Sequence, residues 1–187
     1  IKKGSRIVLK NIGINKLRIG LIDVLIKMGA KIEIKNENIL CGEPIGDLYV
    51  EYSVLRPIKI SGNIISKLID ELPILFIICA TCKGISEFND ISELRFKESD
   101  RIKSMQEGLS KLGINISSTK DSIKIEGGII NGGTVNSYED HRVAMSFVIA
   151  GLVSSNPITI IDTKNIDTSF PNFVNLMKNN GCKIYQI

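Results

Sequence analysis

The sequence contains few of the residues on which several common kinds of site depend. It has one histidine, no tryptophan and four scattered cysteines, Cys41, Cys79, Cys82 and Cys182. One histidine provides few ligands for a zinc site. The only close cysteine pair lies in an apolar stretch, without neighbouring groups that would lower the pKa of a thiol. We therefore interpret the cysteines as small buried hydrophobic residues, and we expect neither a metal ion nor another cofactor.

Aromatic side chains and long apolar runs are also scarce. Aromatic residues make up 5% of the chain, and the basic residues are dispersed, with a formal net charge of +4. This composition argues against a nucleic-acid partner and favours an acidic small molecule. No apolar run reaches the roughly 20 residues of a membrane-spanning helix, and the N-terminus lacks the apolar core of a signal peptide. We expect no membrane partner and a cytoplasmic location.

The length and composition predict a globular protein. The chain has 187 residues, 43% of them hydrophobic, which is enough for a sizeable core. No linker rich in Pro, Ser or Gly interrupts it, so we predict one domain over residues 1–187. The chain begins at Ile1 without a methionine, which predicts that it is a piece of a longer protein.

One local pattern recurs three times. A helical run ends at a glycine and an alternating strand follows, at KMGAKIEIK (27–35), KLGINISST (111–119) and NNGCKIYQI (179–187). Helices are expected at 16–28, 68–82, 102–112 and 140–153, of which 68–82 and 140–153 are apolar nearly all round and should be buried. Further strands are expected at 6–11, 48–52, 58–61, 85–88, 122–126, 134–136 and 158–162. These elements predict a mixed α/β domain with threefold internal pseudo-symmetry, because one such unit cannot bury both faces of its own sheet.

The densest charge lies in ELRFKESDRI, residues 93–102, which leads into a helix ending at Gly113. Ser99 is the predicted N-cap. Arg101 then falls in the first turn, where the partial positive charge of the helix end disfavours a cation by about 0.3–1 kcal/mol. The placement of this arginine therefore needs an explanation.

Two interpretations of the charged cluster remain open. An anionic ligand in front of the helix would suit Arg101 and its neighbour Lys97, which form a like-charge i,i+4 pair if the helix already holds at residue 97. Alternatively, Glu98 and Asp100 neutralise both cations on a solvated surface.

Two other helix starts carry unusual polar groups. Asp70 and Glu71 precede a buried helix, where acidic residues commonly act as caps. Arg142 falls in the first turn of the second buried helix and needs either Asp140 or a ligand anion as its partner. His141 is the only histidine, and a lone histidine is more often structural than catalytic. Two arginines at two helix starts suit a doubly charged anion such as a phosphorylated carboxylic acid.

Five motifs then connect the chain with a known family. They are GEPIGDL (42–48), LIDELPIL (68–75), ELRFKESDRI (93–102), DHRVAM (140–145) and TSFPNF (168–173). In their order and spacing the chain resembles the C-terminal domain of the 3-phosphoshikimate 1-carboxyvinyltransferases, or EPSP synthases, over nearly its whole length. The resemblance implies an inside-out α/β barrel of three βαβαββ units, with central helices and outer sheets.

The resemblance also implies a reaction and a division of roles. The family transfers the enolpyruvyl group of phosphoenolpyruvate to the 5-hydroxyl of shikimate 3-phosphate and releases phosphate. Asp70 resembles the aspartate that contacts the shikimate hydroxyls and is a candidate base, and Glu98 resembles the glutamate proposed to protonate the methylene carbon. Lys97 is similar to the lysine that contacts shikimate 3-phosphate. Arg101 and Arg142 are similar to two arginines that bind phosphoenolpyruvate.

The chain departs from the family in two respects. Thr168 stands where many members have a lysine before the Ser/Thr-Phe-Pro motif, and the nearby Lys164 is not assigned that role. His141 lies beside the phosphoenolpyruvate-binding arginines, with a less defined role. The family's N-terminal domain is absent, so the isolated chain is expected to be inactive, although the full-length form is expected to be a monomer. Glyphosate competes for the phosphoenolpyruvate site in this family, with determinants partly in the absent half.

Two alternatives to this assignment remain open, one a related enzyme and the other a binding protein without catalytic activity. The related UDP-N-acetylglucosamine enolpyruvyl transferase shares the fold but lacks the combination of KESDR and DHR. A free-standing anion-binding module without catalysis would use the same cations and have no missing half.

Overall fold

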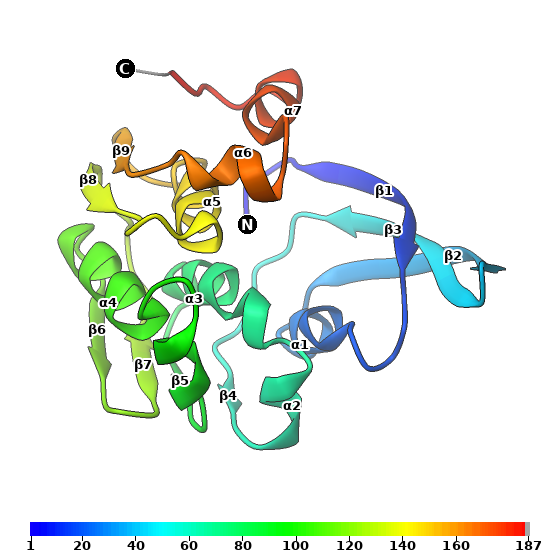
Figure 1. Ribbon diagram of the computed structural model, residues 1–187, viewed down its shortest axis with the longest axis horizontal. Coiled ribbons are helices and arrows are strands. Elements are labelled where there is room, and N and C mark those ends of the chain that lie inside the picture. The colour runs from blue at the N-terminus through cyan, green and yellow to red at the C-terminus, as the bar shows by residue number, and fades with distance from the viewer. Residues whose placement is uncertain (186–187) are drawn as a thin grey trace.

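The computed structural model describes residues 1–185, which form a mixture of helices and three separate sheets (Figure 1). The first sheet is antiparallel, in the order β1 (Arg6–Gly13), β3 (Glu43–Glu51), β2 (Lys31–Leu40). The second sheet has the order β4 (Lys59–Ile60), β5 (Ile85–Phe88), β7 (Ile123–Glu126), β6 (Asn115–Ser118). The third sheet pairs β8 (Gly133–Asn136) with β9 (Ile158–Ile161) in parallel.

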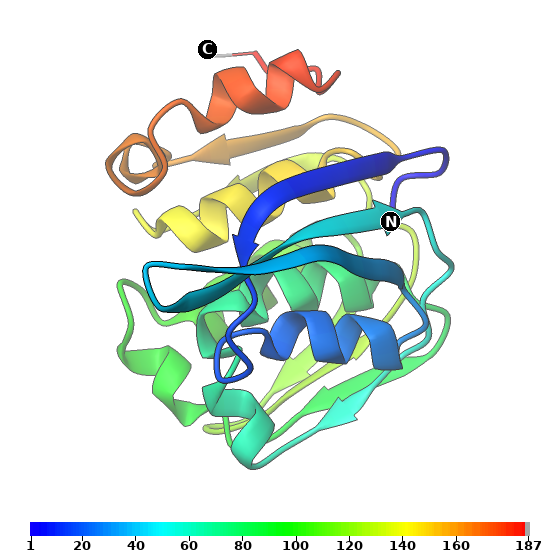
Figure 2. The ribbon, with the colours of Figure 1, turned by 90° about the vertical axis from the view of Figure 1, so that its right-hand side faces the viewer.

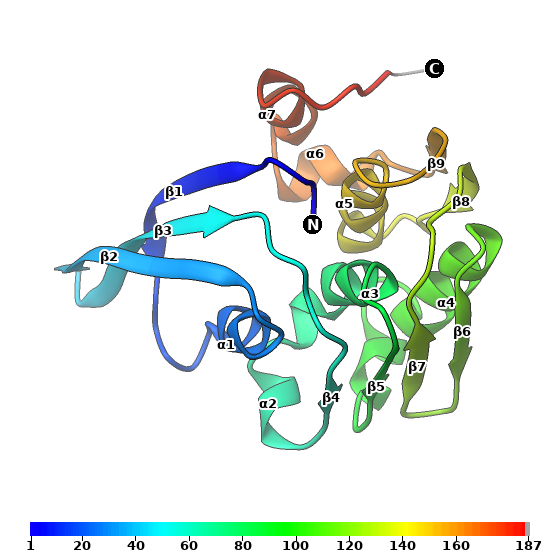
Figure 3. The same cartoon turned by 180° about the vertical axis from the view of Figure 1, so that it is seen from behind.

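Residues 1–185 form the helices α1 (Gly20–Lys27), α2 (Asn63–Ser66), α3 (Leu72–Ala80), α4 (Arg101–Lys111), α5 (His141–Ala150), α6 (Asn165–Ser169) and α7 (Phe173–Asn179). Helices α1, α3 and α5 lie between the sheets, as the views from the front and from behind both show, whereas α7 lies at the edge of the molecule (Figures 1 and 3). Helix α3 contacts both α4 and α5. In the side view, the first sheet lies in front of these helices (Figure 2). Within residues 1–185, no helix is both long enough and apolar enough to cross a membrane.

Helix α3 is the centre of the core, as its all-apolar sequence predicts. Every one of its residues except Ile74 is buried, and Phe76 meets Phe88 of β5 edge to face, with ring centroids 4.9 Å apart. The predicted helix at 68–82 is shorter in the structure, because its first turn is a separate 3₁₀ helix, Ile69–Glu71. Asp70 lies in this separate 3₁₀ helix.

The first sheet is larger than the sequence predicts, since β2 continues to Leu40 and β3 starts at Glu43. Cys41 and Gly42 form the two-residue turn between them, with φ of 50° and 83°. Positive φ at both positions matches the twist of a tight hairpin, so pairing continues up to the turn. Cys41 is consequently exposed, and its prediction as a buried residue is wrong, whereas Cys79 and Cys82 are buried. Burial raises the pKa of the Cys79 thiol to about 12 and that of Cys82 to about 11.

The repeated glycines all adopt the expected left-handed conformation. Gly29, Gly113 and Gly181 have φ of 97°, 85° and 88°. The strand that follows is formed in the first two copies, as β2 and β6. In the third copy residues 182–185 form no strand, and residues 186–187 lie outside the described part of the chain. An alternating pattern becomes a strand only when a neighbouring strand pairs with it, and no strand within residues 1–185 pairs with this segment.

The helix predicted at 16–28 begins only at Gly20. The side chain of Asn15 accepts a hydrogen bond from the backbone N–H of Leu17 at 3.0 Å, and this local turn occupies the start of the expected helix. Asparagine side chains commonly stabilise such turns in competition with helix formation.

The close approach of Gly127 to the end of α3 gives a stability prediction. A Cβ at this position would lie 1.7 Å from the carbonyl oxygen of Cys82 and 2.9 Å from that of Cys79. Because backbone atoms cannot rotate away, Gly127→Ala is expected to lower the free energy of unfolding by about 3 kcal/mol, measured by urea denaturation. Gly128→Ala is the control, since its Cβ would meet only a methyl group of Ile114 at 3.9 Å. Equal urea midpoints for the two variants would contradict the prediction.

Candidate active site

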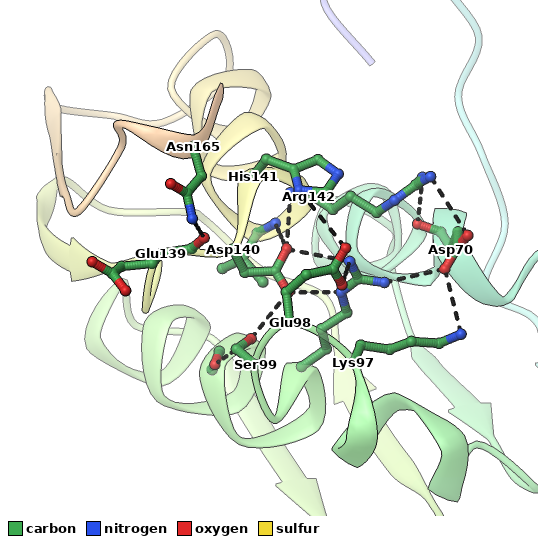
Figure 4. A network of polar contacts seen from close by, with 12 residues as sticks. Asp70, Lys97, Glu98, Ser99, Glu139, Asp140, His141, Arg142 and Asn165 are labelled. Atoms are coloured by element: carbon green, nitrogen blue, oxygen red, sulfur yellow. Dashed lines mark hydrogen bonds and ion pairs between the residues drawn. The ribbon is translucent and has the colours of Figure 1, made fainter. Parts of the chain in front are cut away.

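The starts of three helices meet at one place, where they bring together all six predicted site residues (Figure 4). These are Asp70 from the 3₁₀ helix before α3, Lys97 and Glu98 from the connection before α4, Arg101 from the first position of α4, and His141 and Arg142 from the first two positions of α5. The polar groups that the sequence places at three separate helix starts therefore lie in one site.

Arg101 is the centre of the network and is fully buried. Its Nε donates to Oδ2 of Asp140 at 2.8 Å, its Nη2 to Oε2 of Glu98 at 2.6 Å, and its Nη1 to Oδ1 of Asp70 at 3.2 Å. A buried guanidinium is stable only when carboxylates replace its lost hydration, and three of them do so here. The solvated-surface interpretation is wrong for Arg101, although Glu98 is indeed one of its partners.

Asp140 has two roles in the structure, and the sequence predicts only the first of them. It caps α5 as expected, because Oδ1 accepts hydrogen bonds from the backbone N–H groups of Arg142 at 2.9 Å and Val143 at 3.3 Å. Its contact with Arg101 was not predicted. Burial acts to raise the pKa of Asp140, but the hydrogen bond and charge of Arg101 outweigh it and hold that pKa below its usual value.

Asp70 binds cations instead of capping a helix. Its carboxylate lies 3.5 Å from Nη2 of Arg142 and 3.8 Å from Nζ of Lys97, in addition to its bond with Arg101. Neither the 3₁₀ helix nor α3 has a side-chain cap hydrogen bond, so the interpretation of Asp70 and Glu71 as ordinary caps is wrong. Their carboxylates instead form ion pairs with the cations of the site.

Arg142 is held by the segment before α3. Its Nη1 donates to the backbone carbonyl of Asp70 at 3.0 Å and lies 3.6 Å from Oε1 of Glu71. The expected alternative, pairing of the Arg142 side chain with Asp140, is not what the structure contains, because Asp140 turns toward Arg101. About a third of the Arg142 side chain remains exposed and can meet a ligand.

Lys97 and His141 lie on either side of Glu98 in this site. Lys97 has extended backbone angles, so the helical like-charge pair with Arg101 does not form. It instead donates to Glu93, and this hydrogen bond raises the pKa of Lys97. His141 is mostly buried, with Nδ1 3.9 Å from Oε1 of Glu98. Glu93 was not among the predicted site residues.

The N-cap of α4 is Asp100, and the prediction of Ser99 is wrong. Oδ1 of Asp100 accepts a hydrogen bond from the backbone N–H of Lys103 at 2.9 Å, while Oδ2 pairs with Arg95 at 2.6 Å. Ser99 lies one residue too early to cap the helix. Its hydroxyl instead donates to Oδ2 of Asp140 at 3.1 Å and so joins the buried network.

A cavity of about 130 Å³ opens beside this network. Its polar side carries Asp70, Glu71 and Arg142, and its apolar side is formed by Ile74, Met145, Ile149 and Phe173. The arrangement thus offers half-exposed carboxylates that can transfer protons and a partly exposed arginine that can bind an anion. Arg101 is fully buried and each of its three nitrogens donates to a carboxylate, so an anion reaches its Nη1–Nη2 end by exchanging with Asp70 and Glu98.

Comparison with solved structures defines the class of fold. The chain is similar to the enolpyruvyl transferase NikO from Streptomyces tendae, with a TM-score of 0.74 and 15% identity over 97% of this chain and 40% of the other. This likeness shows a shared fold. An EPSP synthase from Acinetobacter baumannii is much more similar, with a TM-score of 0.93 and 42% identity over 97% of this chain and 43% of that one.

Sequence comparison gives the family. The family model for EPSP synthase (3-phosphoshikimate 1-carboxyvinyltransferase) matches residues 1–177, and the chain belongs to this family. A 3-phosphoshikimate 1-carboxyvinyltransferase from Legionella pneumophila (strain Paris) is 47% identical over 174 residues, covering 93% of this chain and 40% of the relative. One from Nitrosococcus oceani is 46% identical over 184 residues, covering 98% and 41%. The chain therefore spans about two fifths of the length of these curated relatives.

Proposed function

We propose that this chain is the C-terminal half of an enzyme that transfers the enolpyruvyl group of phosphoenolpyruvate to the 5-hydroxyl of shikimate 3-phosphate and releases phosphate. The observation that carries the proposal is the meeting of Asp70, Glu98, Arg101 and Arg142 at three helix starts. Membership of the EPSP synthase family supports it. The enzyme belongs to the shikimate pathway, which leads to chorismate and the aromatic amino acids.

The fold that we propose for residues 1–187 is a single inside-out α/β barrel of three βαβαββ-type repeats, with central helices and outer sheets. Three sheets with helices between them support this architecture. In this arrangement helix starts from successive repeats share one end of the domain, which explains how residues 31 and 39 positions apart in sequence contact the same guanidinium.

The cations bind the two anionic substrates in this proposal. Arg142 and Arg101 bind phosphoenolpyruvate, and Lys97 contacts shikimate 3-phosphate. Arginine suits the first task because its guanidinium stays charged and its planar fork matches a carboxylate or phosphate. His141 lies against Glu98 and helps to enclose that end of the site.

The carboxylates perform the proton transfers. Glu98, as the acid, delivers a proton to the methylene carbon of phosphoenolpyruvate while the 5-hydroxyl oxygen bonds to the adjacent carbon and Asp70 accepts the hydroxyl proton. The C–O bond to phosphate in the resulting tetrahedral intermediate then breaks, and the departing phosphate takes the proton held by Asp70. Glu98 takes back a proton from the methyl group to restore the double bond, so both carboxylates return to their starting states. Both carboxylates contact the same guanidinium, so they lie close enough to act on one substrate pair.

The other wall of the site belongs to the remaining part of the polypeptide. We propose that this part is the N-terminal domain, that it completes the binding of both substrates, and that the complete enzyme is a monomer. Thr168 cannot supply the positive charge of the lysine found there in many members. A basic group of the other half therefore has to contribute more to phosphate binding.

The direct test is to incubate the complete polypeptide with phosphoenolpyruvate and shikimate 3-phosphate and to measure released phosphate together with the enolpyruvyl product. We expect stoichiometric formation of both. The matched control replaces shikimate 3-phosphate by UDP-N-acetylglucosamine, with which no phosphate should appear. Turnover with the nucleotide sugar alone would assign the chain to the related transferase, and binding of both substrates without turnover would make it an anion-binding module.

A further inference from the structure

We propose that Asp140 is the positioning residue for both arginines of the site. One of its oxygens fixes the side chain of Arg101, and the other fixes the backbone from which Arg142 projects. The identity of the bound anion, phosphoenolpyruvate, rests on the function proposed above.

The two oxygens of Asp140 have separate tasks. Oδ2 accepts from Nε of Arg101 at 2.8 Å and from the hydroxyl of Ser99 at 3.1 Å. Oδ1 accepts from the backbone N–H of Arg142 at 2.9 Å and that of Val143 at 3.3 Å, and lies 3.4 Å from Nη2 of Arg101. One buried carboxylate thus ties the first turn of α5 to the arginine that opens α4.

The edge of the guanidinium that Asp140 occupies is the one a ligand does not need. Asp140 takes the side formed by Nε and Nη2, and the end formed by Nη1 and Nη2 is shared by Asp70 and Glu98. That end is a fork of two parallel N–H donors, which one planar carboxylate can bind in bidentate fashion. A ligand carboxylate can therefore replace Asp70 and Glu98 while Asp140 stays in place.

Burial separates the permanent partner of Arg101 from its exchangeable partners. Asp140 is fully buried, whereas 42% of the Asp70 side chain and 49% of the Glu98 side chain are exposed. Water can solvate Asp70 and Glu98 after they leave the guanidinium, but it does not reach Asp140. Displacement also frees the two carboxylates that the proposed reaction uses for proton transfer.

The test is the Asp140→Asn variant of the complete enzyme. Asparagine keeps an oxygen that can accept from the N–H of Arg142, so the α5 cap is retained, but it loses the charge that holds Arg101. We expect the KM for phosphoenolpyruvate to rise at least about tenfold, while the KM for shikimate 3-phosphate changes by less than about twofold. An unchanged KM for phosphoenolpyruvate in this variant, with normal turnover by the parent enzyme, would overturn the inference. Absence of turnover in the parent would instead overturn the proposed function.

Asp100→Asn is the matched control. Asp100 is also an N-cap paired with an arginine, and its partner Arg95 lies outside the network around Arg101. This variant is expected to lose less thermal stability than Asp140→Asn, because the Asp100–Arg95 pair is partly exposed, and its KM for phosphoenolpyruvate should stay within about twofold of the parent. An equal rise of that KM in both variants would mean that removing the charge of any N-cap aspartate near the site explains the effect, and would contradict the inference.

A double-mutant cycle with Arg101→Gln gives a readout that a purely structural role does not affect. If Asp140 acts through Arg101, adding Asp140→Asn to Arg101→Gln should change the KM for phosphoenolpyruvate by less than about threefold. The double variant also covers the case in which Asp140→Asn does not fold, because it removes both buried charges together. A further tenfold rise would show that Asp140 acts independently of Arg101 and would reject the proposal.

Discussion

Replacing Glu98 by glutamine in the complete enzyme is expected to lower kcat by at least about a hundredfold, with the KM of each substrate changing by less than about threefold. Glutamine keeps the size of the side chain and an oxygen that can accept from Arg101, but it cannot deliver a proton to carbon. Glu98 is suited to that task because half of its side chain is exposed and its contact with Nη2 of Arg101, 2.6 Å long, can be exchanged for a ligand carboxylate. Steady-state kinetics at saturating concentrations of both substrates measure the effect.

Glu139→Gln is the matched control for this variant. Glu139 lies at the edge of the same region (Figure 4), is exposed, and its carboxylate takes part in none of the ion pairs found in residues 1–185. Its kcat should stay within about twofold of the parent value. Undiminished turnover by Glu98→Gln would remove Glu98 from proton transfer, and an equal loss in both variants would point to a general effect of negative charge near the site.

The 187-residue chain by itself is expected to release no measurable phosphate from phosphoenolpyruvate and shikimate 3-phosphate. It spans about 40% of the length of its curated relatives, and the cations that it contributes are largely paired with its own carboxylates. Without the opposite wall, these internal ion pairs are not displaced and water is not excluded from the reacting atoms.

The assay compares equal concentrations of the isolated chain and the complete polypeptide in a continuous phosphate assay. Far-ultraviolet circular dichroism of the isolated chain establishes that it is folded under the assay conditions. Turnover by the folded chain alone, at even a hundredth of the parent rate, would contradict the view that the site is shared between two halves.

Local sequence was sufficient for the elements that depend on near neighbours along the chain. Gly29 and Gly113 end their helices with positive φ, and the apolar sequence around Phe76 becomes the buried helix α3. Periodicity and glycine placement encode such features within a few residues, because the hydrogen bonds of a helix and its cap are local. The five motifs also identified the family and six of the residues that the site brings together.

The extent of the strands was less predictable, because pairing depends on a partner elsewhere in the chain. The turn at Cys41 and Gly42 extends β2 and β3 beyond their alternating parts, and residues 182–185 form no strand despite their pattern. A strand is stabilised by its neighbours in the sheet more than by its own side chains.

The sequence by itself predicted six residues that the structure brings together at one place, and the family that the comparisons confirm. Only the tertiary structure decided how they are paired: Arg101 is buried, Asp140 holds its Nε, and Asp70 binds three cations instead of capping a helix. The physical reason is distance along the chain. Asp140 and Asp70 lie 39 and 31 residues from Arg101, so their contacts arise from the packing of three helices and not from any local preference.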